Sequence, residues 1–355
     1  MHAVRGESGE EIRDEMPSAD AGAGFAEAAG VVRSLNADHD AEYHLIGRFE
    51  TGEWGAYRVV EPGGKPVVLK FFLDLQDTNI MDPDPHLATE ITDRLRALGY
   101  PTPEYLHAGW LNNHGLYWVM EELPGEPLWQ DPTVDQVEEL VSLLRLQREQ
   151  AISEKQNLSV LVKDVVFEER HGKAEKLRSY SGETRELLHQ VTRLVRGLED
   201  LPVTHGDIVH GDFSYHQAMI EDNRIVGIID WQEAGCGDWL IDLTRLVYSL
   251  HDRSELVAPV LREAEQQDPR KIKLYTGYTV LEMVSWPVYR RDAGVSTGSI
   301  NKARSAVDFV NSRFLAGHLG LDSAARPPPA SAGSSPEPGF PTLPLISSRC
   351  PQSLI

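Results

Sequence analysis

The chain has 355 residues, of which 41% are hydrophobic and 25% charged, a composition typical of a globular protein large enough for two lobes. The formal net charge of −21 argues against nucleic acid or an anionic membrane as the main partner. Because there are only two cysteines, no signal peptide and no apolar run near the roughly 18 residues of a membrane span, we expect a cytoplasmic protein without disulfides.

The two ends of the chain differ in composition from its middle. Residues 1–40 are rich in Ala, Gly, Glu and Asp, and apart from a short helical stretch at Val31–Leu35 they predict an acidic, disordered tail. Residues 321–355 are dominated by Pro, Ser, Ala and Gly and keep no helical or strand period, which predicts a second disordered tail. The folded part should therefore span residues 41–320.

Residues 41–122 are predicted to form an N-terminal lobe built on a sheet. Segments rich in β-branched and aromatic residues alternate with turn signals such as Pro62-Gly63-Gly64. One helix is expected at 87–98, where apolar residues recur at helical spacing. The five predicted strands are 43–49, 54–60, 67–73, 104–111 and 116–121.

Residues 123–320 are predicted to form a larger and mainly helical C-terminal lobe. It follows the turn at Pro124-Gly125, and Thr133 with Gln136 forms a capping box at the start of its first helix. The fold class is therefore α+β, with two lobes and a cleft between them where a ligand would bind. Further helices are expected at 187–198, 239–251, 254–266, 271–290 and 301–316.

The chemistry is concentrated in residues 203–243, VTHGDIVHGDFSYHQAMIEDNRIVGIIDWQEAGCGDWLIDL. A His-Gly-Asp triplet ends in Asp212, two short strands form a hairpin, and the second strand leads into Asp230. Phosphoryl transfer needs one carboxylate beside the attacking hydroxyl and another on the metal that carries the phosphates. We predict that Asp212 takes up the acceptor's proton, and that Asp230 and the side-chain oxygen of Gln217 bind Mg²⁺.

These motifs resemble the aminoglycoside phosphotransferase family, the small-molecule branch of the protein-kinase-like fold. The family pattern of HGD, four residues and Asn stands here as HGDFSYHQ, followed by IIDW and GDWLIDL, and the likeness covers about residues 43–316. The resemblance implies ATP and Mg²⁺ as cofactors, a catalytic base at Asp212 and a metal ligand at Asp230. It also implies that His210 and Asp242 support the catalytic loop.

The resemblance extends to the N-terminal lobe. Lys70, in the strand Val67-Val68-Leu69-Lys70, would contact the α- and β-phosphates, and Glu90 on the following helix would hold it. Glu121 and Leu123 lie in the linker between the lobes, whose backbone would bind adenine. The order of strand lysine, helix glutamate, HGD and Asp favours this interpretation over four unrelated solvated charges.

Two features of the catalytic stretch depart from a simple match. The triplet occurs twice, and we choose the second because only Asp212 precedes Asp230 by a family-like 18 residues, whereas Asp207 lies too far upstream. Gln217 stands where the family has Asn. Its side chain keeps the amide oxygen but is one methylene longer, so it binds the metal only if the loop shifts, or it weakens one metal site.

The acceptor is predicted to be a small molecule with a hydroxyl, with aminoglycoside-type antibiotics as the first candidates. A cationic acceptor would be attracted by acidic side chains such as Glu233, Asp238 and the stretch at Glu168-Glu169. Choline, homoserine, sugars and macrolides are alternatives within the same family. A non-catalytic nucleotide-binding pseudokinase and a metal-dependent hydrolase using His210 are alternatives of other classes. The sequence is silent on oligomeric state.

Overall fold

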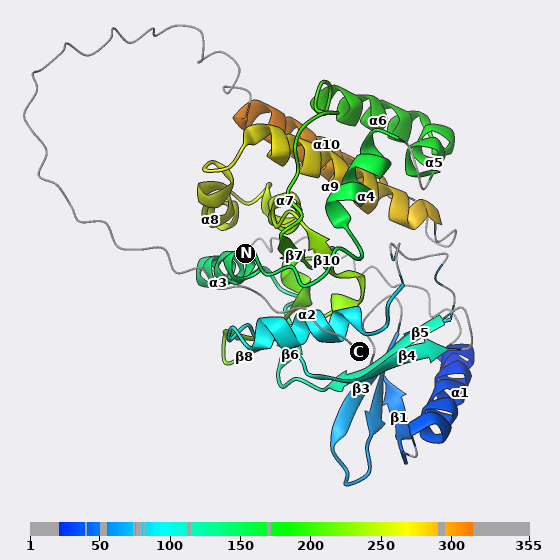
Figure 1. Ribbon diagram of the computed structural model, residues 1–355. Coiled ribbons are helices and arrows are strands. Elements are labelled where there is room, and N and C mark those ends of the chain that lie inside the picture. The colour runs from blue at the N-terminus through cyan, green and yellow to red at the C-terminus, as the bar shows by residue number, and fades with distance from the viewer. Residues whose placement is uncertain are drawn as a thin grey trace, which may run out of the picture. The chain divides into compact units, whose positions relative to one another are not determined.

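The structure is a computed structural model that describes residues 21–39, 41–49, 55–73, 75, 80, 83–111, 115–168, 172–289 and 295–314. It confirms the predicted α+β architecture, with a five-stranded antiparallel sheet followed by a mainly helical part (Figure 1). The predicted tail at 321–355 lies outside the described residues, as do residues 1–20 and 40 of the N-terminal tail.

The sheet of the N-terminal lobe has the strand order β1-β2-β3-β5-β4. Neighbouring strands pair antiparallel throughout, and each predicted strand is found within two residues of its expected ends. The strands are β1 (His44–Arg48), β2 (Ala56–Val60), β3 (Pro66–Phe72), β4 (Tyr105–Leu111) and β5 (Gly115–Glu121).

Strand β3 shows how the sheet directs its side chains to two different cores. Successive side chains of a strand point to opposite faces. Val67, Leu69 and Phe71 therefore belong to one buried cluster, and Phe72 belongs to the other. By the same alternation Lys70 shares a face with Phe72, which is the face turned toward the helical lobe.

A helix covers the sheet on its first face and corrects the prediction of a tail at 1–40. Residues Ala21–His39 form α1, which packs on the sheet through Ala28, Val31, Val32 and Leu35 (Figure 1). The sequence concealed this helix because it contains several glycines, each of which costs a helix interior about 1 kcal/mol. Burial of its apolar stripe against the sheet outweighs that cost, so the N-terminal lobe has two helices rather than the one predicted.

The predicted helix at 87–98 is α2 (Leu87–Arg96), and it lies between the sheet and the helical lobe (Figure 1). Its buried side includes Leu87, Ile91 and Leu95. The segment after α2 joins the two lobes, because the backbone N–H of Ile228 donates to the Pro101 carbonyl at 2.9 Å. The Tyr100 ring also packs edge-on against Trp231, with ring centroids 5.5 Å apart.

The C-terminal lobe is built from eight helices among the residues described. α4 and α5 were not predicted, and α3 begins at the expected capping box at Thr133. α7, α8 and α9 lie within two residues of their predicted ends, whereas α6 begins five residues and α10 four residues earlier than predicted. No helix in the described ranges is both long and apolar enough to cross a bilayer. The helices are α3 (Val134–Leu146), α4 (Leu158–Val166), α5 (Lys173–Tyr180), α6 (Gly182–Leu194), α7 (Leu240–Leu250), α8 (Ser254–Ala264), α9 (Pro269–Tyr289) and α10 (Thr297–Arg313).

Short strands between α6 and α7 carry the catalytic stretch. The predicted hairpin is β8 (Ala218–Glu221) with β9 (Arg224–Ile228), and β6 (Glu126–Pro127) pairs with its outer edge. β7 (Asp207–Val209) pairs with β10 (Gly235–Gly237). Two single 3-10 turns complete the stretch, η3 (Tyr215–Gln217) and η4 (Trp231–Glu233).

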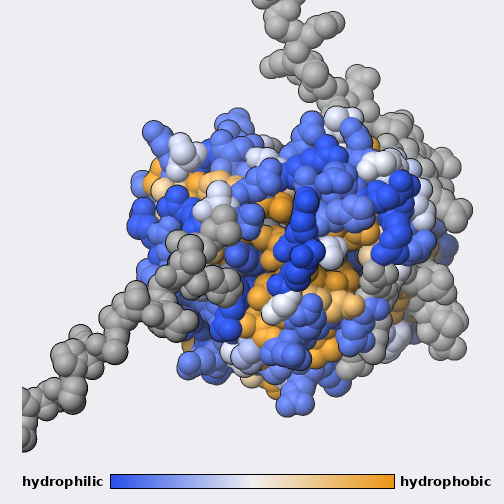
Figure 2. All heavy atoms as spheres, turned by 90° about the horizontal axis from the view of Figure 1, so that it is seen from above, coloured by the Kyte–Doolittle hydropathy of each residue, from blue (hydrophilic) through white to orange (hydrophobic). Residues whose placement is uncertain are grey.

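One face of the molecule agrees with a chain in which 25% of the residues are charged. Figure 2 shows a face on which hydrophilic residues predominate, with apolar residues visible between them near its middle. Apolar atoms commonly make up more than half of a folded protein's surface, so this patch by itself assigns no function.

Candidate active site

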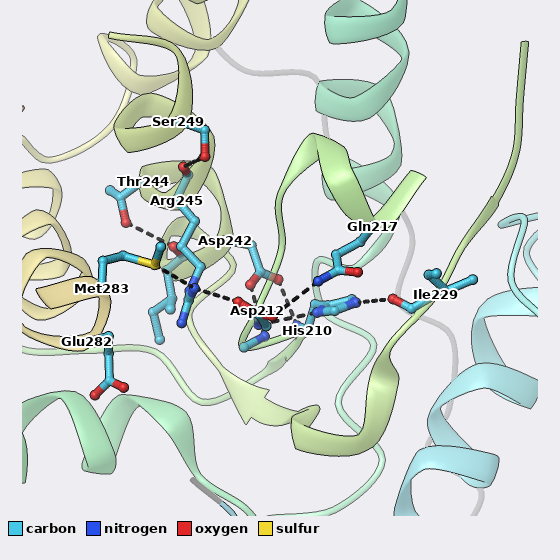
Figure 3. A network of polar contacts seen from close by, with 12 residues as sticks. His210, Asp212, Gln217, Ile229, Asp242, Thr244, Arg245, Ser249, Glu282 and Met283 are labelled. Carbon is cyan, nitrogen blue, oxygen red and sulfur yellow. Dashed lines mark hydrogen bonds and ion pairs between the residues drawn. The ribbon is translucent and has the colours of Figure 1, made fainter. Parts of the chain in front are cut away.

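The backbone of the loop that follows β7 is hydrogen-bonded to a buried carboxylate. Asp242 of α7 is fully buried, and it accepts hydrogen bonds from the backbone N–H of His210 at 2.7 Å and of Gly211 at 3.0 Å (Figure 3). The Gln147 side-chain amide donates to it at 3.1 Å. Burial raises the pKa of Asp242, and these donors oppose that rise. These are the contacts that the expected bracing role requires.

The tight turn of this loop depends on Gly211. Its φ of +85° lies in the left-handed region, and a Cβ at this position would stand 3.1 Å from the Glu233 carbonyl oxygen. A side chain would therefore meet both backbone strain and a close neighbour. The glycine of the triplet is required by geometry, and it lets the loop pass close to η4.

The His210 ring links the catalytic loop to the strand that precedes Asp230. His210 is fully buried, its Nε2 donates to the Ile229 carbonyl at 2.8 Å, and its Nδ1 accepts from the backbone N–H of Asp212 at 3.2 Å (Figure 3). The ring also lies 4.5 Å from the Trp231 ring. His210 is thus an internal link between the two aspartate-bearing segments, which agrees with the supporting role expected for it.

The Asp212 side chain is half exposed, and both of its oxygens have partners. Oδ1 accepts from Nη1 of Arg245 at 2.8 Å, and Oδ2 accepts from Nε2 of Gln217 at 3.1 Å. A carboxylate oxygen offers about two acceptor positions, so each one keeps room for a second donor. The carboxylate is fixed yet open to solvent, as a base for an incoming hydroxyl must be.

Gln217 bridges the two aspartate segments. Its amide nitrogen points toward Asp212 and its amide oxygen points away (Figure 3). Its backbone carbonyl accepts from the N–H of Ile229 at 2.9 Å, one residue before Asp230. The extra methylene of Gln therefore does not separate this side chain from the site. It contacts the proposed base and leaves its oxygen for another partner.

Asp230 lies at the end of β9 in an unusual backbone conformation. Its φ of 73° and ψ of 46° are left-handed, a conformation that costs a non-glycine residue roughly 1 kcal/mol or more. The buried Trp231 secures the turn by donating its indole N–H to the Ile228 carbonyl at 2.9 Å. The Asp230 carboxylate forms an ion pair with Lys70 of β3, so the two lobes meet at the predicted metal and phosphate residues.

The predicted pairing of Lys70 with Glu90 is not formed within the described residues. α2 turns Leu87, Ile91 and Leu95 inward, which places Glu90 on its exposed side. Lys70 pairs with Asp230 instead. The correction has a simple cause, because helical periodicity fixes which side of α2 faces the sheet, and Glu90 is on the other side.

Glu121 is the last residue of β5, and Leu123 follows it in the segment before β6. The Glu121 backbone N–H donates to the Glu104 carbonyl at 2.8 Å, which ends the pairing of β5 with the segment before β4. Leu123 lies against β9, since a Cβ on Gly227 would stand 2.1 Å from its Cδ1. An adenine contact by Glu121 and Leu123 stays a prediction.

The residues available for a metal are oxygen donors. The described residues contain no group of three or more His, Cys, Asp or Glu placed to bind an ion. The Asp230 carboxylate and the Gln217 amide oxygen are both hard ligands, and Mg²⁺ commonly binds one or two protein oxygens and completes its shell with water and phosphate. The donor set therefore fits Mg²⁺ held jointly with a nucleotide.

The first His-Gly-Asp triplet has a structural role. Asp207 is buried, and it accepts from the backbone N–H of Glu149 at 2.8 Å and of Trp239 at 3.1 Å. Burial raises its pKa. Asp207 ties the end of α3 to the start of α7, so the choice of the second triplet for catalysis agrees with the geometry.

Three charged residues near the site were not identified from the sequence. Arg245 binds Asp212. Glu282 of α9 pairs with Lys173 of α5, and both of these side chains are nearly buried. A charge in the otherwise apolar α7, three residues after Asp242, could have indicated Arg245, because a buried charge requires a partner. Nothing local indicated the pairing of Lys173 with Glu282, which are far apart in the chain.

Asp238 is not available to a cationic acceptor, contrary to expectation. It is buried, and it accepts from Lys271 Nζ at 2.7 Å and from the Tyr275 hydroxyl at 2.9 Å. Its carboxylate is part of the lobe's interior. Glu233 is only partly buried and lies beside the Gly211 turn, whereas Glu169 is outside the described residues.

Residues 50–275 match the protein family described as the phosphotransferase enzyme family, APH. The chain belongs to this family. This confirms the predicted family and the predicted enzyme class, a phosphotransferase. The sequence matches no curated protein.

Solved structures of small-molecule kinases share the fold. A thermostable mutant of aminoglycoside phosphotransferase APH(4)-Ia, in ternary complex with AMP-PNP and hygromycin B, aligns with a TM-score of 0.57 and 16% identity over 81% of this chain and 99% of that one. Choline kinase LicA from Streptococcus pneumoniae aligns with a TM-score of 0.54 and 15% identity, over 81% and 99%. Amicoumacin kinase hAmiN gives 0.52 and 12%, over 82% and 96%. These TM-scores show a common fold, and sequence identities this low leave the acceptor open.

Proposed function

We propose that this phosphotransferase moves the γ-phosphoryl group of ATP to a hydroxyl of a small molecule, with Asp212 as the base. The proposal rests on hydrogen bonds that join the segments of the two aspartates. In the loop that bears Asp212, His210 and Gln217 are hydrogen-bonded to Ile229, which directly precedes Asp230. One site thus holds a solvent-open carboxylate and a second carboxylate beside a lysine from the other lobe.

The chain's own groups would act as follows. The acceptor oxygen attacks the γ-phosphorus as its proton passes to the Asp212 carboxylate, and the bond to the bridging oxygen breaks with its electron pair leaving on ADP. Lys70 would hold phosphate oxygens, and Asp230 with the Gln217 amide oxygen would hold Mg²⁺. When bound, the metal neutralises phosphate charge. Leu123 and Glu121 would bind adenine through their backbone.

The neighbours of known chemistry support this nucleotide and metal. AMP-PNP accompanies hygromycin B in one of the similar structures, and the amicoumacin kinase structure is a complex with AMP-PNP, Ca²⁺ and Ami. We extend ATP and a divalent ion to this chain because its oxygen donors and its lysine suit them. A cytoplasmic location, where ATP is abundant and thiols stay reduced, accords with this use and with only two cysteines.

For the acceptor we propose a cationic small molecule, with aminoglycoside-type antibiotics first among the candidates. The pKa of the buried Tyr278 is raised by burial and further by the charges of Glu282, Glu233 and Asp212, as expected for an acidic environment. Glu233 lies beside the Gly211 turn and Asp212 is half exposed, so both carboxylates would attract a positive group at this site.

The proposal is tested by coupled ADP release from Mg-ATP against a panel of aminoglycosides, other antibiotics, choline, homoserine and small sugars. We expect one class to raise ADP release far above the acceptor-free rate, and Asp212→Asn to remove that increase. Thermal melts with and without Mg-ATP accompany the screen, since binding to the native state raises the midpoint. Stabilisation by Mg-ATP with no turnover on any acceptor would instead indicate a pseudokinase.

A further inference from the structure

Among the described residues, Arg245 is the one charged group that contacts Asp212. The proposed reaction gives it no role. It lies in α7, where every neighbour in sequence is buried, and it is itself only 6% exposed. Its Nε has no hydrogen-bond partner among the described residues, so the contact from Nη1 to Oδ1 of Asp212 at 2.8 Å is its principal ion pair. A buried guanidinium is costly to a fold unless its partner is fixed.

The partner is fixed from two directions. Asp212 is 50% exposed and would otherwise sample several side-chain conformations at the surface of the cleft. Arg245 holds Oδ1 from α7, and Gln217 holds Oδ2 from the catalytic loop (Figure 3). Donors on both oxygens set the plane of the carboxylate as well as its position. Phosphoryl transfer depends more on the placement of the reacting groups than on a strong base, so a fixed orientation of the Asp212 carboxylate should raise kcat.

Arg245 is held in turn by α9. Its Nη1 lies 3.8 Å from Sδ of Met283, which approaches from the side opposite Asp212 (Figure 3). Burial by itself would lower the pKa of Arg245, but the negative charges of Asp212 and Glu282 raise it, so the guanidinium stays charged. The charged Arg245 side chain therefore connects α9 with the loop that carries Asp212.

We propose that Arg245 is a positioning residue for phosphoryl transfer, which holds the Asp212 carboxylate in the orientation that receives the acceptor's proton. The inference rests on the proposed function, since it takes Asp212 as the base. Arg245 touches neither substrate, and its effect is transmitted through Asp212.

The first test compares Arg245→Met with Arg262→Met. Arg262 is a matched control, because it pairs with Glu138 at an exposed position between α8 and α3, away from the site. We expect Arg245→Met to lower kcat about 10- to 100-fold, as the loss of a hydrogen bond to a charged group implies. KM for ATP should stay within about twofold, because nothing in the nucleotide site contacts Arg245. Arg262→Met should leave both constants unchanged.

Two further variants separate positioning from a general effect on folding. Arg245→Lys keeps the charge and should recover part of kcat, and added guanidinium chloride at millimolar concentration should restore part of the activity of Arg245→Ala but not of an Arg262→Ala control. A kcat for Arg245→Met within twofold of wild type would overturn the inference. So would an Arg245→Lys enzyme that folds and turns over no better than Arg245→Met.

Asp212→Asn distinguishes failure of the inference from failure of the proposed function. If Asp212→Asn keeps wild-type turnover, the base is wrong and the role of Arg245 falls with it. If Asp212→Asn is inactive and Arg245→Met fully active, only the inference fails. Should no acceptor be found, the same comparison is made on the slow transfer of phosphate from Mg-ATP to water.

Discussion

The chain contains the tripeptide His-Gly-Asp twice within eight residues, and the two copies are opposite in burial. In the first, His205 is exposed and Asp207 is buried against two backbone N–H groups. In the second, His210 is buried and Asp212 is half exposed, held by two side chains. A carboxylate bonded to backbone amides in the interior stabilises the fold, whereas one held by side chains at the surface remains open to a substrate.

The comparison shows that a motif acquires its role from what surrounds it. Asp207 and Asp212 have the same two preceding residues and lie five positions apart. β7 ends between them, so the first aspartate lies in a strand and the second in a loop braced by Asp242. The following variants test whether this division between a structural and a catalytic aspartate holds.

The largest effect is expected at Asp212. Asp212→Asn keeps the size of the side chain but removes the base, so kcat should fall by about 10²- to 10⁴-fold. The melting midpoint should also fall, because Asp212 is the ion-pair partner of the buried Arg245, so turnover is compared per folded molecule. Asp207→Asn is the matched control, and its turnover per folded molecule should stay near wild type. Equal losses of turnover in the two variants would abolish the distinction between the triplets.

Asp230 should be essential for the metal-bound nucleotide. Asp230→Asn removes the charge that pairs with Lys70, and we expect Mg-ATP no longer to raise the melting midpoint. In the wild type, ligand at 100 times its Kd should add about 2.7 kcal/mol to the free energy of unfolding. Differential scanning fluorimetry across Mg-ATP concentrations measures this, with Asp222→Asn in the exposed hairpin turn as a control. An undiminished shift in Asp230→Asn would rule out Asp230 as a metal ligand.

Asp242 should combine the two roles, since it is buried and also supports the catalytic loop. Asp242→Asn turns an acceptor of three hydrogen bonds into a group that presents donors to His210 and Gly211. We expect the free energy of unfolding to fall by about 3 kcal/mol, and kcat to fall even at temperatures where the variant is folded. Denaturant unfolding and steady-state kinetics measure the two effects, and a variant with wild-type kcat would show that the brace is dispensable for catalysis.

Asp207 should affect stability alone and in a pH-dependent way. Asp207→Asn should lower the free energy of unfolding by about 1–3 kcal/mol. Because the pKa of Asp207 is raised in the folded state, its protonation favours the fold, so its contribution is greatest below the ordinary carboxyl range and declines as pH rises through the folded-state pKa. The stability difference between wild type and Asp207→Asn should therefore narrow from acid to neutral pH, and a difference that widens would contradict this sign.

The smallest effect is expected at Gln217. Gln217→Asn shortens the side chain, so its amide no longer reaches Oδ2 of Asp212, which is 3.1 Å away in the present structure. One neutral donor is worth about 1 kcal/mol, so kcat should fall by roughly fivefold. Gln217→Leu, which also removes the amide oxygen, should be slower than Gln217→Asn and require more Mg²⁺. A Gln217→Asn enzyme with a higher kcat than wild type would show that Gln at this position lowers the rate of transfer.

The sequence alone was sufficient for the framework of the fold and for the order of the site. Strands of period two, the hairpin before Asp230 and the capping box at Thr133 are local signals, since each depends on residues a few positions apart. The spacing of 18 residues between Asp212 and Asp230 also lies within one stretch, so the choice between the two triplets could be made from the sequence, and it stays a prediction.

Only the tertiary structure decided which charges meet. It placed Glu90 on the outer side of α2, removed Asp238 into the interior and showed α1 packed on the sheet despite its glycines. It also brought Arg245 to Asp212 and Lys173 to Glu282, which lie 33 and 109 residues apart in the chain. Local periodicity carries no information on such pairs, because burial and the packing of distant elements determine which buried charges find a partner.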